Sequence, residues 1–286
     1  MLIEYIKENK EAKLAYKIFN IFKLEKIENK SVISIPINQK TRTKKIEQNA
    51  EKLSKYLYNN NIKHVVLSTE LMKIEKLKNI LYSNNINILE GKNLSKFLTY
   101  NIIQKIYEYK KTKIEAGEIT ILVNENNETN IRNIIKIAQN VKRLNIITAE
   151  TRKFRKIVEY LYNELGILIK LTNNIKINLT SSDIILNIDF PEEWVNQLNI
   201  PSNVTIVSIP NEIKIFSKRF AGINIKNWNV EIPDKYKFNE FETNILYEAT
   251  LYNKQIDEIY EQIASDEIKI KNLLGINGEI NKAEFV

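Results

Sequence analysis

A repeated pattern between residues 119 and 210 constrains the fold of this chain more than any other feature of its sequence. Short runs rich in β-branched residues alternate there with polar turns and amphipathic segments. Apolar runs of this length, joined by helices, are typical of strands buried on both faces of a parallel sheet. The pattern therefore predicts an α/β domain with strands at Ile119–Val123, Leu144–Thr148, Ile167–Leu171, Ile184–Ile188 and Val204–Ile209.

A smaller α/β unit is predicted ahead of this domain. A helix at about 11–27 opens the chain, and apolar periodicity then places strands at 32–37, 65–68 and 86–89 and helices at 44–59 and 70–82. This alternation favours a separate three-stranded parallel sheet. His64 precedes the middle strand, at the end away from the crevice in which such sheets bind ligands, so we interpret it as a structural histidine.

Two long helices are predicted outside the sheets. One runs from about Leu94 to Glu115 and is ended by Gly117; the other begins near Asn239, where Glu242 has capping-box spacing, and runs to about Ala264. The apolar stripe of the second helix is expected to pack on the smaller unit. The resulting division is a small α/β domain (1–93), a connecting helix (94–116), a larger α/β domain (117–237) and a C-terminal helical segment (238–286) that returns to the first domain.

Composition removes several classes of chemistry. The 286 residues include no cysteine and one histidine, which leaves hydroxyl, carboxylate, lysine or metal chemistry for any reaction. No run approaches 18 uncharged apolar residues, and the acidic residues near the N-terminus do not fit a signal peptide. We therefore expect a cytoplasmic protein that does not enter a membrane.

The net charge of +8 has two interpretations. It could mark a surface that binds nucleic acid, or it could reflect the abundance of lysine throughout the chain. The basic residues are spread over every predicted helix, and the two local clusters, 40–45 and 110–113, carry no interleaved aromatic side chains. The second interpretation is favoured, and nucleic acid is disfavoured as a partner.

The candidate ligand-binding residues follow the strands of the larger domain, because the carboxyl ends of parallel strands form the crevice in which open α/β sheets bind ligands. Glu150 lies beyond the carboxyl end of the second strand, where open α/β sheets that bind dinucleotides place a ribose-binding acid, and Arg152 stands where a 2′-phosphate would be bound. A solvated turn is the alternative for both, with Thr151 capping the next helix and Gly166 ending it. The candidate groove residues are Asn124, Glu125, Asn126, Glu150, Arg152 and Asp189.

Carboxylates gather after the fourth strand. Asp189, Glu192 and Glu193 could hold Mg²⁺ through oxygen ligands. They could also be an N-terminal helix cap with acids in the first turn, after Pro191. The cap is the favoured interpretation, and we assign no metal site.

The order of elements resembles a known group of two-domain proteins. A small α/β domain, a connecting helix, a larger parallel sheet and a returning C-terminal helix are similar to the shikimate dehydrogenase and glutamyl-tRNA reductase group. Residues 144–156, 179–189 and 201–208 are similar to that group's second strand and following turn, its small-residue turn before an apolar strand, and its next turn and strand. The resemblance covers about 119–210 and implies a Rossmann-like fold with a nucleotide-binding crevice.

The loop after the first strand departs from that group. Dinucleotide-binding loops need glycines so that the backbone can approach the pyrophosphate, whereas residues 124–130 read Asn-Glu-Asn-Asn-Glu-Thr-Asn. The smaller domain also lacks a counterpart of the lysine–aspartate substrate pair of shikimate dehydrogenases. Two hypotheses remain: a non-catalytic binding or regulatory module with lost or altered dinucleotide binding, and an NAD(P)-dependent oxidoreductase with an atypical nucleotide loop.

The sequence leaves the partners of the chain undecided. The cofactor is unknown under the first hypothesis, and it would be NAD or NADP only under the second. A neutral, cationic or metal-bridged ligand would suit the acidic loop better than a phosphate. Neither a protein partner nor an oligomeric state can be assigned, and a homo-oligomer stays open.

Overall fold

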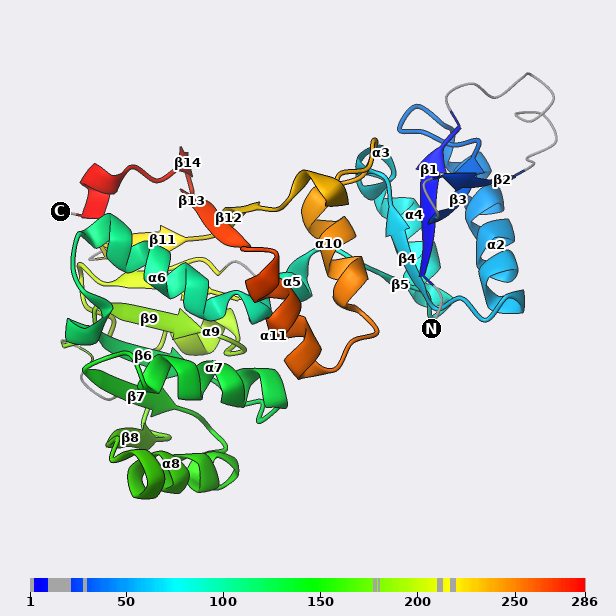
Figure 1. Ribbon diagram of the computed structural model, residues 1–286. Coiled ribbons are helices and arrows are strands. Elements are labelled where there is room, and N and C mark those ends of the chain that lie inside the picture. Colours follow the sequence, from blue (N-terminus) through cyan, green and yellow to red (C-terminus); the bar gives the residue numbers. More distant parts are fainter. Residues whose placement is uncertain are drawn as a thin grey trace. The chain divides into compact units, whose positions relative to one another are not determined.

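The computed structural model describes residues 3–9, 22–27, 30–176, 179, 181–209, 213–216 and 220–285. The chain forms two compact units. The first contains residues 1–91 and 232–255, and the second contains residues 92–231 and 256–286. Each unit is therefore built from two separate stretches of sequence (Figure 1).

The first unit contains a five-stranded sheet in the order β2-β3-β1-β4-β5. Strands β3, β1, β4 and β5 are parallel, and β2 is antiparallel to β3. The three predicted strands are present and parallel, but the prediction of a three-stranded sheet is wrong because β1 separates β3 from β4. The strands are β1 (Ile3–Glu8), β2 (Lys23–Ile27), β3 (Lys30–Ile35), β4 (His64–Leu67) and β5 (Asn87–Ile88).

Strand β1 was not predicted from the sequence because two of its three inward-facing side chains are acidic. Glu4, Ile6 and Glu8 are buried in alternation with more exposed neighbours. Ser31 donates a hydrogen bond to Glu4, and Ser68 donates one to Glu8 with an O–O distance of 2.6 Å. Buried carboxylates are tolerated when they are hydrogen-bonded, so a strand with no apolar run still occupies the centre of the sheet.

The helix predicted at 11–27 is wrong where the structure can test it. Residues 23–27 form the edge strand β2, whose side chains are mostly exposed. Residues 10–21 lie outside the described part of the chain.

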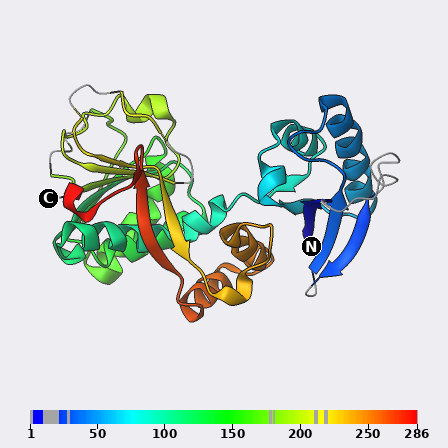
Figure 2. The same ribbon diagram turned by 90° about the horizontal axis from the view of Figure 1, so that it is seen from above.

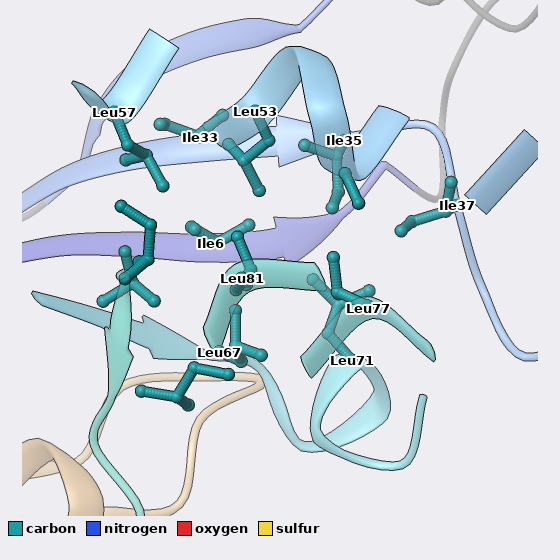
Figure 3. Packing of buried hydrophobic residues seen from close by; sticks show 14 of the residues in the cluster. Ile6, Ile33, Ile35, Ile37, Leu53, Leu57, Leu67, Leu71, Leu77 and Leu81 are labelled. Atoms are coloured by element: carbon teal, nitrogen blue, oxygen red, sulfur yellow. The ribbon is translucent and has the colours of Figure 1, made fainter. Parts of the chain in front are cut away.

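Helices α2 (Thr43–Asn59), α3 (Thr69–Met72) and α4 (Glu75–Ser83) cover one face of this sheet. The predicted helix at 70–82 is divided, because the chain leaves helical geometry at Ile74 before α4 begins. Figure 3 shows how side chains from strands and helices meet in the core of the unit, which includes Ile6, Ile33, Leu53, Leu57, Leu67, Leu77 and Leu81.

The C-terminal part of the chain supplies a further layer to the first unit. Helix α10 (Thr243–Leu251) and the residues before it pack on Val66 and Leu89 through Phe241, Ile245, Leu246 and Ala249. A helix therefore does return to the first domain, as the sequence predicted.

The returning helix is shorter than predicted. Residues 252–255 interrupt it, and α11 (Ile256–Ser265) belongs to the second unit. The expected capping box is also wrong: α10 begins at Thr243, and the side chain of Glu242 makes no capping hydrogen bond.

The second unit contains a six-stranded parallel sheet in the order β11-β10-β9-β6-β7-β8. Numbered from its own first strand, this order is 6-5-4-1-2-3, which is that of the Rossmann fold. The parallel sheet predicted over 119–209 is confirmed, and β11 is an additional strand. The strands are β6 (Glu118–Leu122), β7 (Arg143–Ile147), β8 (Ile169–Thr172), β9 (Ile184–Asn187), β10 (Thr205–Ser208) and β11 (Ile223–Ile225).

Helices lie on both faces of this sheet, with α6 and α7 on one face and α9 on the other (Figure 2). A three-stranded antiparallel sheet, β12-β13-β14, completes the unit. The helices are α5 (Lys92–Phe97), α6 (Thr99–Lys110), α7 (Glu128–Ala138), α8 (Thr151–Leu165), α9 (Glu192–Val195) and α11, and the added strands are β12 (Asn227–Glu231), β13 (Lys269–Gly275) and β14 (Gly278–Glu279). Short 3₁₀ turns occur at Ile114–Ala116, Asp234–Tyr236 and Lys282–Phe285.

The predicted connecting helix is two helices, α5 and α6, separated at Leu98. Helix α6 ends at Lys110, and the next residue, Lys111, adopts a left-handed conformation with φ of 54°, so Gly117 does not end the helix. Gly117 is required for another reason. A Cβ atom there would lie 2.0 Å from the Tyr107 hydroxyl, which is held next to the first strand of the sheet.

Substitution of Ile245 tests the packing of α10. This side chain is 2% exposed, and truncation to alanine should lower the free energy of unfolding of the first unit by about 2–5 kcal/mol. Denaturant unfolding would measure the loss. Tyr58→Ala is the control, since Tyr58 is 77% exposed and its replacement should change stability by less than about 0.5 kcal/mol. Equal stabilities for the two variants would contradict the packing described here.

The single histidine gives a pH prediction. His64 is buried, and its Nε2 lies 2.6 Å from the Tyr252 hydroxyl. Burial, with a smaller contribution from Lys63, lowers the pKa of His64 below its ordinary value of 6.5. A depressed folded-state pKa means that His64 stabilises the unit above about pH 6.5 and that this stability is lost as the pH falls through the folded-state pKa. The ring resonances in an NMR titration should give a pKa below 6.5; a value at or above 6.5 would contradict burial of the neutral ring.

Candidate functional site

The strand order of the second unit locates its ligand-binding crevice. The chain proceeds from β6 to β7 and β8 on one side, and then crosses to β9 on the other side of β6. In open α/β sheets, ligands bind beyond the carboxyl ends of the strands at this switch point. The loops that follow β6, β7 and β9 therefore form the candidate site.

The carboxylate of Asp189 is at the centre of this region. Its Oδ1 accepts a hydrogen bond from the backbone N–H of Asn124, and its Oδ2 accepts one from the backbone N–H of Glu125, both with N–O distances of 2.6 Å. In Rossmann folds that bind dinucleotides, the N–H groups of this first strand-to-helix turn contact the pyrophosphate. A carboxylate of the chain itself therefore occupies two donors of the kind that a ligand phosphate would use.

The sheet register brings these residues together. Leu122 of β6 pairs with Asn187 of β9. The residues two positions later in each segment, Asn124 and Asp189, therefore lie opposite one another. Asn187 then shapes the turn, because its Oδ1 accepts from the Phe190 N–H at 2.9 Å and its Nδ2 donates to the Phe190 carbonyl at 3.1 Å. Asn187 is therefore the residue that orients the loop carrying Asp189.

Burial and hydrogen bonding act on Asp189 in opposite directions. Burial raises the pKa of its carboxyl group above the ordinary value, and the hydrogen bonds from the Glu125 and Asn124 N–H groups hold back part of that rise. The nearby Glu125 carboxylate raises the pKa further, while Lys96 lowers it. Because burial disfavours the charged form of the carboxyl group, the ionised carboxylate relies on its two N–H donors for stabilisation.

Side-chain amides connect the first loop to the second. Oδ1 of Asn124 accepts hydrogen bonds from the Ala149 N–H at 2.9 Å and from the Thr148 hydroxyl at 3.4 Å. Nδ2 of Asn126 donates to the Lys153 carbonyl. Asparagine side chains thus fill positions where glycines would leave the backbone bare.

The remainder of the loop is also hydrogen-bonded internally. Asn127 caps α7 by accepting from the Asn130 N–H at 2.9 Å, and Nδ2 of Asn130 donates to the Glu125 carbonyl at 2.9 Å. These bonds fix the conformation in which the loop presents its N–H groups to Asp189.

Glu150 and Arg152 lie at the edge of the site. Glu150 precedes the first residue of α8, its side chain is 47% exposed, and it forms an ion pair with Lys153 at 3.4 Å. Thr151 begins α8 without capping it, so the predicted cap is wrong, whereas Gly166 ends the helix with φ of 66° as predicted. Arg152 is exposed, and no ion-pair partner for it occurs among the described residues.

The role of Asp189 differs from the helix cap that the sequence favoured. Helix α9 does begin after Pro191 with Glu192 and Glu193 in its first turn. Asp189 does not cap this helix, because its carboxylate is turned toward the first loop. Within the part of the chain that is described, no three His, Asp or Glu side chains gather in a way that could hold a metal ion.

The structure brings together Asn124, Glu125, Asn126 and Asp189, and it leaves Glu150 and Arg152 on the solvent side. The contact between Asp189 and the loop backbone and the role of Asn187 were not predicted from the sequence. An Asp two residues beyond an apolar strand, opposite a loop without glycine, is the only sequence signal that could have indicated the contact.

Comparisons with known proteins identify no family. The chain matches no protein-family model and no curated protein sequence.

No helix in the described ranges is long and apolar enough to cross a lipid bilayer.

Solved structures with distant similarity include Rossmann-type dehydrogenases and a carbamoyltransferase. L-tryptophan dehydrogenase from Nostoc punctiforme is 9% identical, with 91% of this chain and 78% of that chain covered and a TM-score of 0.37. Ornithine carbamoyltransferase from Pyrococcus furiosus is 11% identical, with coverages of 72% and 71% and a TM-score of 0.27.

A third structure covers a smaller part of both chains. The Δ1-pyrroline-2-carboxylate reductase of Thermococcus litoralis, in complex with NADH and L-proline, is 15% identical, with 42% of this chain covered and a TM-score of 0.29. The match spans 37% of that reductase. Similarities this distant identify no ligand and no reaction for the present chain.

The contact of Asp189 can be tested by hydrogen exchange. Hydrogen bonds to a charged acceptor contribute about 1.5–3 kcal/mol, so the Asn124 and Glu125 amides should exchange roughly tenfold or more faster in Asp189→Ala. Glu193→Ala is the matched control, because it removes the same charge from an exposed residue nearby. Unchanged exchange at both amides in Asp189→Ala would show that the carboxylate does not hold them.

Proposed function

We propose that this protein is a non-catalytic binding or regulatory module, located in the cytoplasm, whose Rossmann-like unit does not take NAD or NADP in the familiar pose. One observation carries the proposal: the Asp189 carboxylate accepts hydrogen bonds from the N–H groups of Asn124 and Glu125. In this proposal Asn124, Glu125, Asn126 and Asp189 line the crevice, and Glu150 and Arg152 lie at its edge.

Electrostatics supports this proposal. A dinucleotide phosphate at the first loop would find the two backbone N–H groups already hydrogen-bonded to the Asp189 carboxylate. Phosphate and carboxylate are both negatively charged, and like charges in a partly buried site repel strongly. The phosphate would have to displace Asp189, which would then lose two charge-assisted hydrogen bonds. Neutral or cationic groups face no such competition, so a ligand of the crevice should lack phosphates at this position.

Steric considerations agree with the electrostatic ones. The Asn124 and Asn126 side chains connect the first loop to residues 148–153 by hydrogen bonds. In glycine-rich loops this space is left for the pyrophosphate. Opening the crevice would therefore break several hydrogen bonds in addition to those of Asp189.

The alternative is an NAD(P)-dependent oxidoreductase similar to the shikimate dehydrogenase group, with an atypical nucleotide loop. The strand order of the second unit and the position of Glu150 favour it. Glu150 follows β7, where such enzymes hold the ribose hydroxyls, and its side chain is 47% exposed. This function would require Asp189 to move away when the cofactor enters.

Titration with NAD and NADP distinguishes the two functions. The natural protein should show no saturable binding of either dinucleotide at concentrations up to about 1 mM, which corresponds to a binding free energy weaker than about −4 kcal/mol. The thermal stability of the second unit should accordingly not rise with dinucleotide concentration. Calorimetry at low salt and thermal unfolding would provide the two readouts.

Variants make this experiment specific to the loop. Asp189→Ala should gain affinity for inorganic pyrophosphate, because both N–H groups become free, whereas Glu193→Ala should resemble the natural protein. Micromolar binding of a dinucleotide by the natural protein would make the oxidoreductase the better account. Absence of any gain in Asp189→Ala would show that the N–H pair does not limit anion binding.

A further inference from the structure

A cavity lies in the Rossmann-like unit, away from the crevice. Its volume is about 630 Å³, and it is formed by the amino ends of β7 and β8 and by the connection from β8 to β9. Figure 1 shows these two strands at one edge of the sheet, beside α8. The lining residues are Lys142, Arg143, Asn145, Leu168, Lys170 and Ser181, together with Ile169 and Leu179.

The cavity lies on a face of the sheet that no helix covers in the described positions of the connection from β8 to β9. Asn145 of β7 pairs with Lys170 of β8, and alternation places Arg143 on the same face as Asn145. The connection that would cover this face, residues 173–183, forms no helix in its described positions. Leu179 lines the cavity and belongs to the same core cluster as Ile147.

The wall of the cavity carries an excess of positive charge. Three of its side chains, Lys142, Arg143 and Lys170, are cationic. Glu118 forms ion pairs with Arg143 at 3.1 Å and with Lys142 at 3.9 Å. For Lys170, the described residues provide no carboxylate partner, so the charge of the wall is not balanced.

Polar and aliphatic groups occupy the rest of the wall. Asn145 is 8% exposed, and its Nδ2 donates to the Thr120 hydroxyl at 3.4 Å, which leaves the second N–H of the amide for a ligand. Ser181 adds a hydroxyl group, and Leu168 and Leu179 add aliphatic surface. No aromatic side chain lines the cavity among the described residues, so it offers no surface on which a nucleobase could stack.

We propose that this cavity binds a phosphate ester of a sugar or a small polyol. Lys170 and Arg143 would hold the phosphate, because an ammonium and a guanidinium group together match its charge and geometry. Asn145 and Ser181 would bind hydroxyl groups, and Leu168 would cover the carbon skeleton. A volume of about 630 Å³ accommodates a ligand of this size.

This site is separate from the crevice. Its charged residues lie at the amino ends of β7 and β8, whereas Asp189 and its donors lie beyond the carboxyl ends of the strands. Strands β7 and β8 are five and four residues long, so about 13–17 Å of strand separates their two ends. Binding here therefore does not depend on whether Asp189 blocks the crevice.

Ribose 5-phosphate is the probe for this proposal, with ribose and inorganic phosphate as comparisons. Calorimetry at low salt should give saturable binding of the ester that is at least about tenfold tighter than binding of either comparison. Chemical-shift changes in NMR spectra should be concentrated at residues 142–145 and 168–170. The same measurements on glycerol 3-phosphate would establish whether a smaller polyol suffices.

Two variants localise the binding. Lys170→Ala should weaken binding of ribose 5-phosphate by about tenfold or more, because it removes the unpaired charge. Lys52→Ala is the matched control: Lys52 is exposed on α2 of the first unit, and its loss should leave the affinity within about twofold.

Three results would overturn the proposal. Failure of both esters to bind saturably would remove the site. Equal weakening by Lys170→Ala and Lys52→Ala would show a general effect of charge. Inorganic phosphate binding as tightly as the esters would show that the cavity recognises no sugar or polyol.

Discussion

The candidate site depends on one interaction, the acceptance of two backbone hydrogen bonds by the Asp189 carboxylate. Asn124 and Glu125 supply the donors from the loop that follows the first strand of the second unit. A partly buried carboxylate needs such donors, and the N–H groups at a strand-to-helix turn need an acceptor, so each satisfies the other. A phosphate commonly fills this role in Rossmann folds, and here the chain supplies the anion itself.

The surrounding structure is organised to keep this carboxylate in place. Register places Asp189 opposite Asn124, and the turn made by Asn187 orients it. Asparagine side chains then join the first and second loops. A Rossmann-like fold can thus retain its strand order while a carboxylate of the chain itself occupies the N–H groups of its first loop, and fold alone does not assign a function to such a crevice.

Much of the fold could be predicted from the sequence because short apolar runs indicate strands that are buried on both faces of a parallel sheet. The strands beginning near Ile119, Leu144 and Ile184 were found in this way. Strand β1 could not be found, since the inward-facing Glu4 and Glu8 break the apolar pattern and accept hydrogen bonds from residues distant in sequence.

Helix ends were harder to predict. Apolar periodicity continues across Leu98 and across residues 252–255, so a single helix was expected at each place. The break at 252–255 marks a point where the chain passes from one unit to the other, and local sequence does not encode that division.

The candidate site was only partly predictable for a related reason. Sequence identified the loop without glycine and named Asp189, but the contact between them depends on strand pairing between residues 65 positions apart. The basic cavity was missed because it lies on a face of the sheet that no helix covers in the described positions of residues 173–183. Neither the pairing of strands that are distant in sequence nor a sheet face without a covering helix produces a local pattern in the sequence.

Scalar coupling across hydrogen bonds tests the central contact most directly. In a deuterated, ¹³C- and ¹⁵N-labelled sample, the account predicts correlations from the amide nitrogens of Asn124 and Glu125 to the Asp189 carboxylate carbon, with both amide protons shifted downfield. If those amides instead show no coupling to Asp189 and exchange freely with water, the carboxylate does not occupy the donors, and the account of the crevice is wrong.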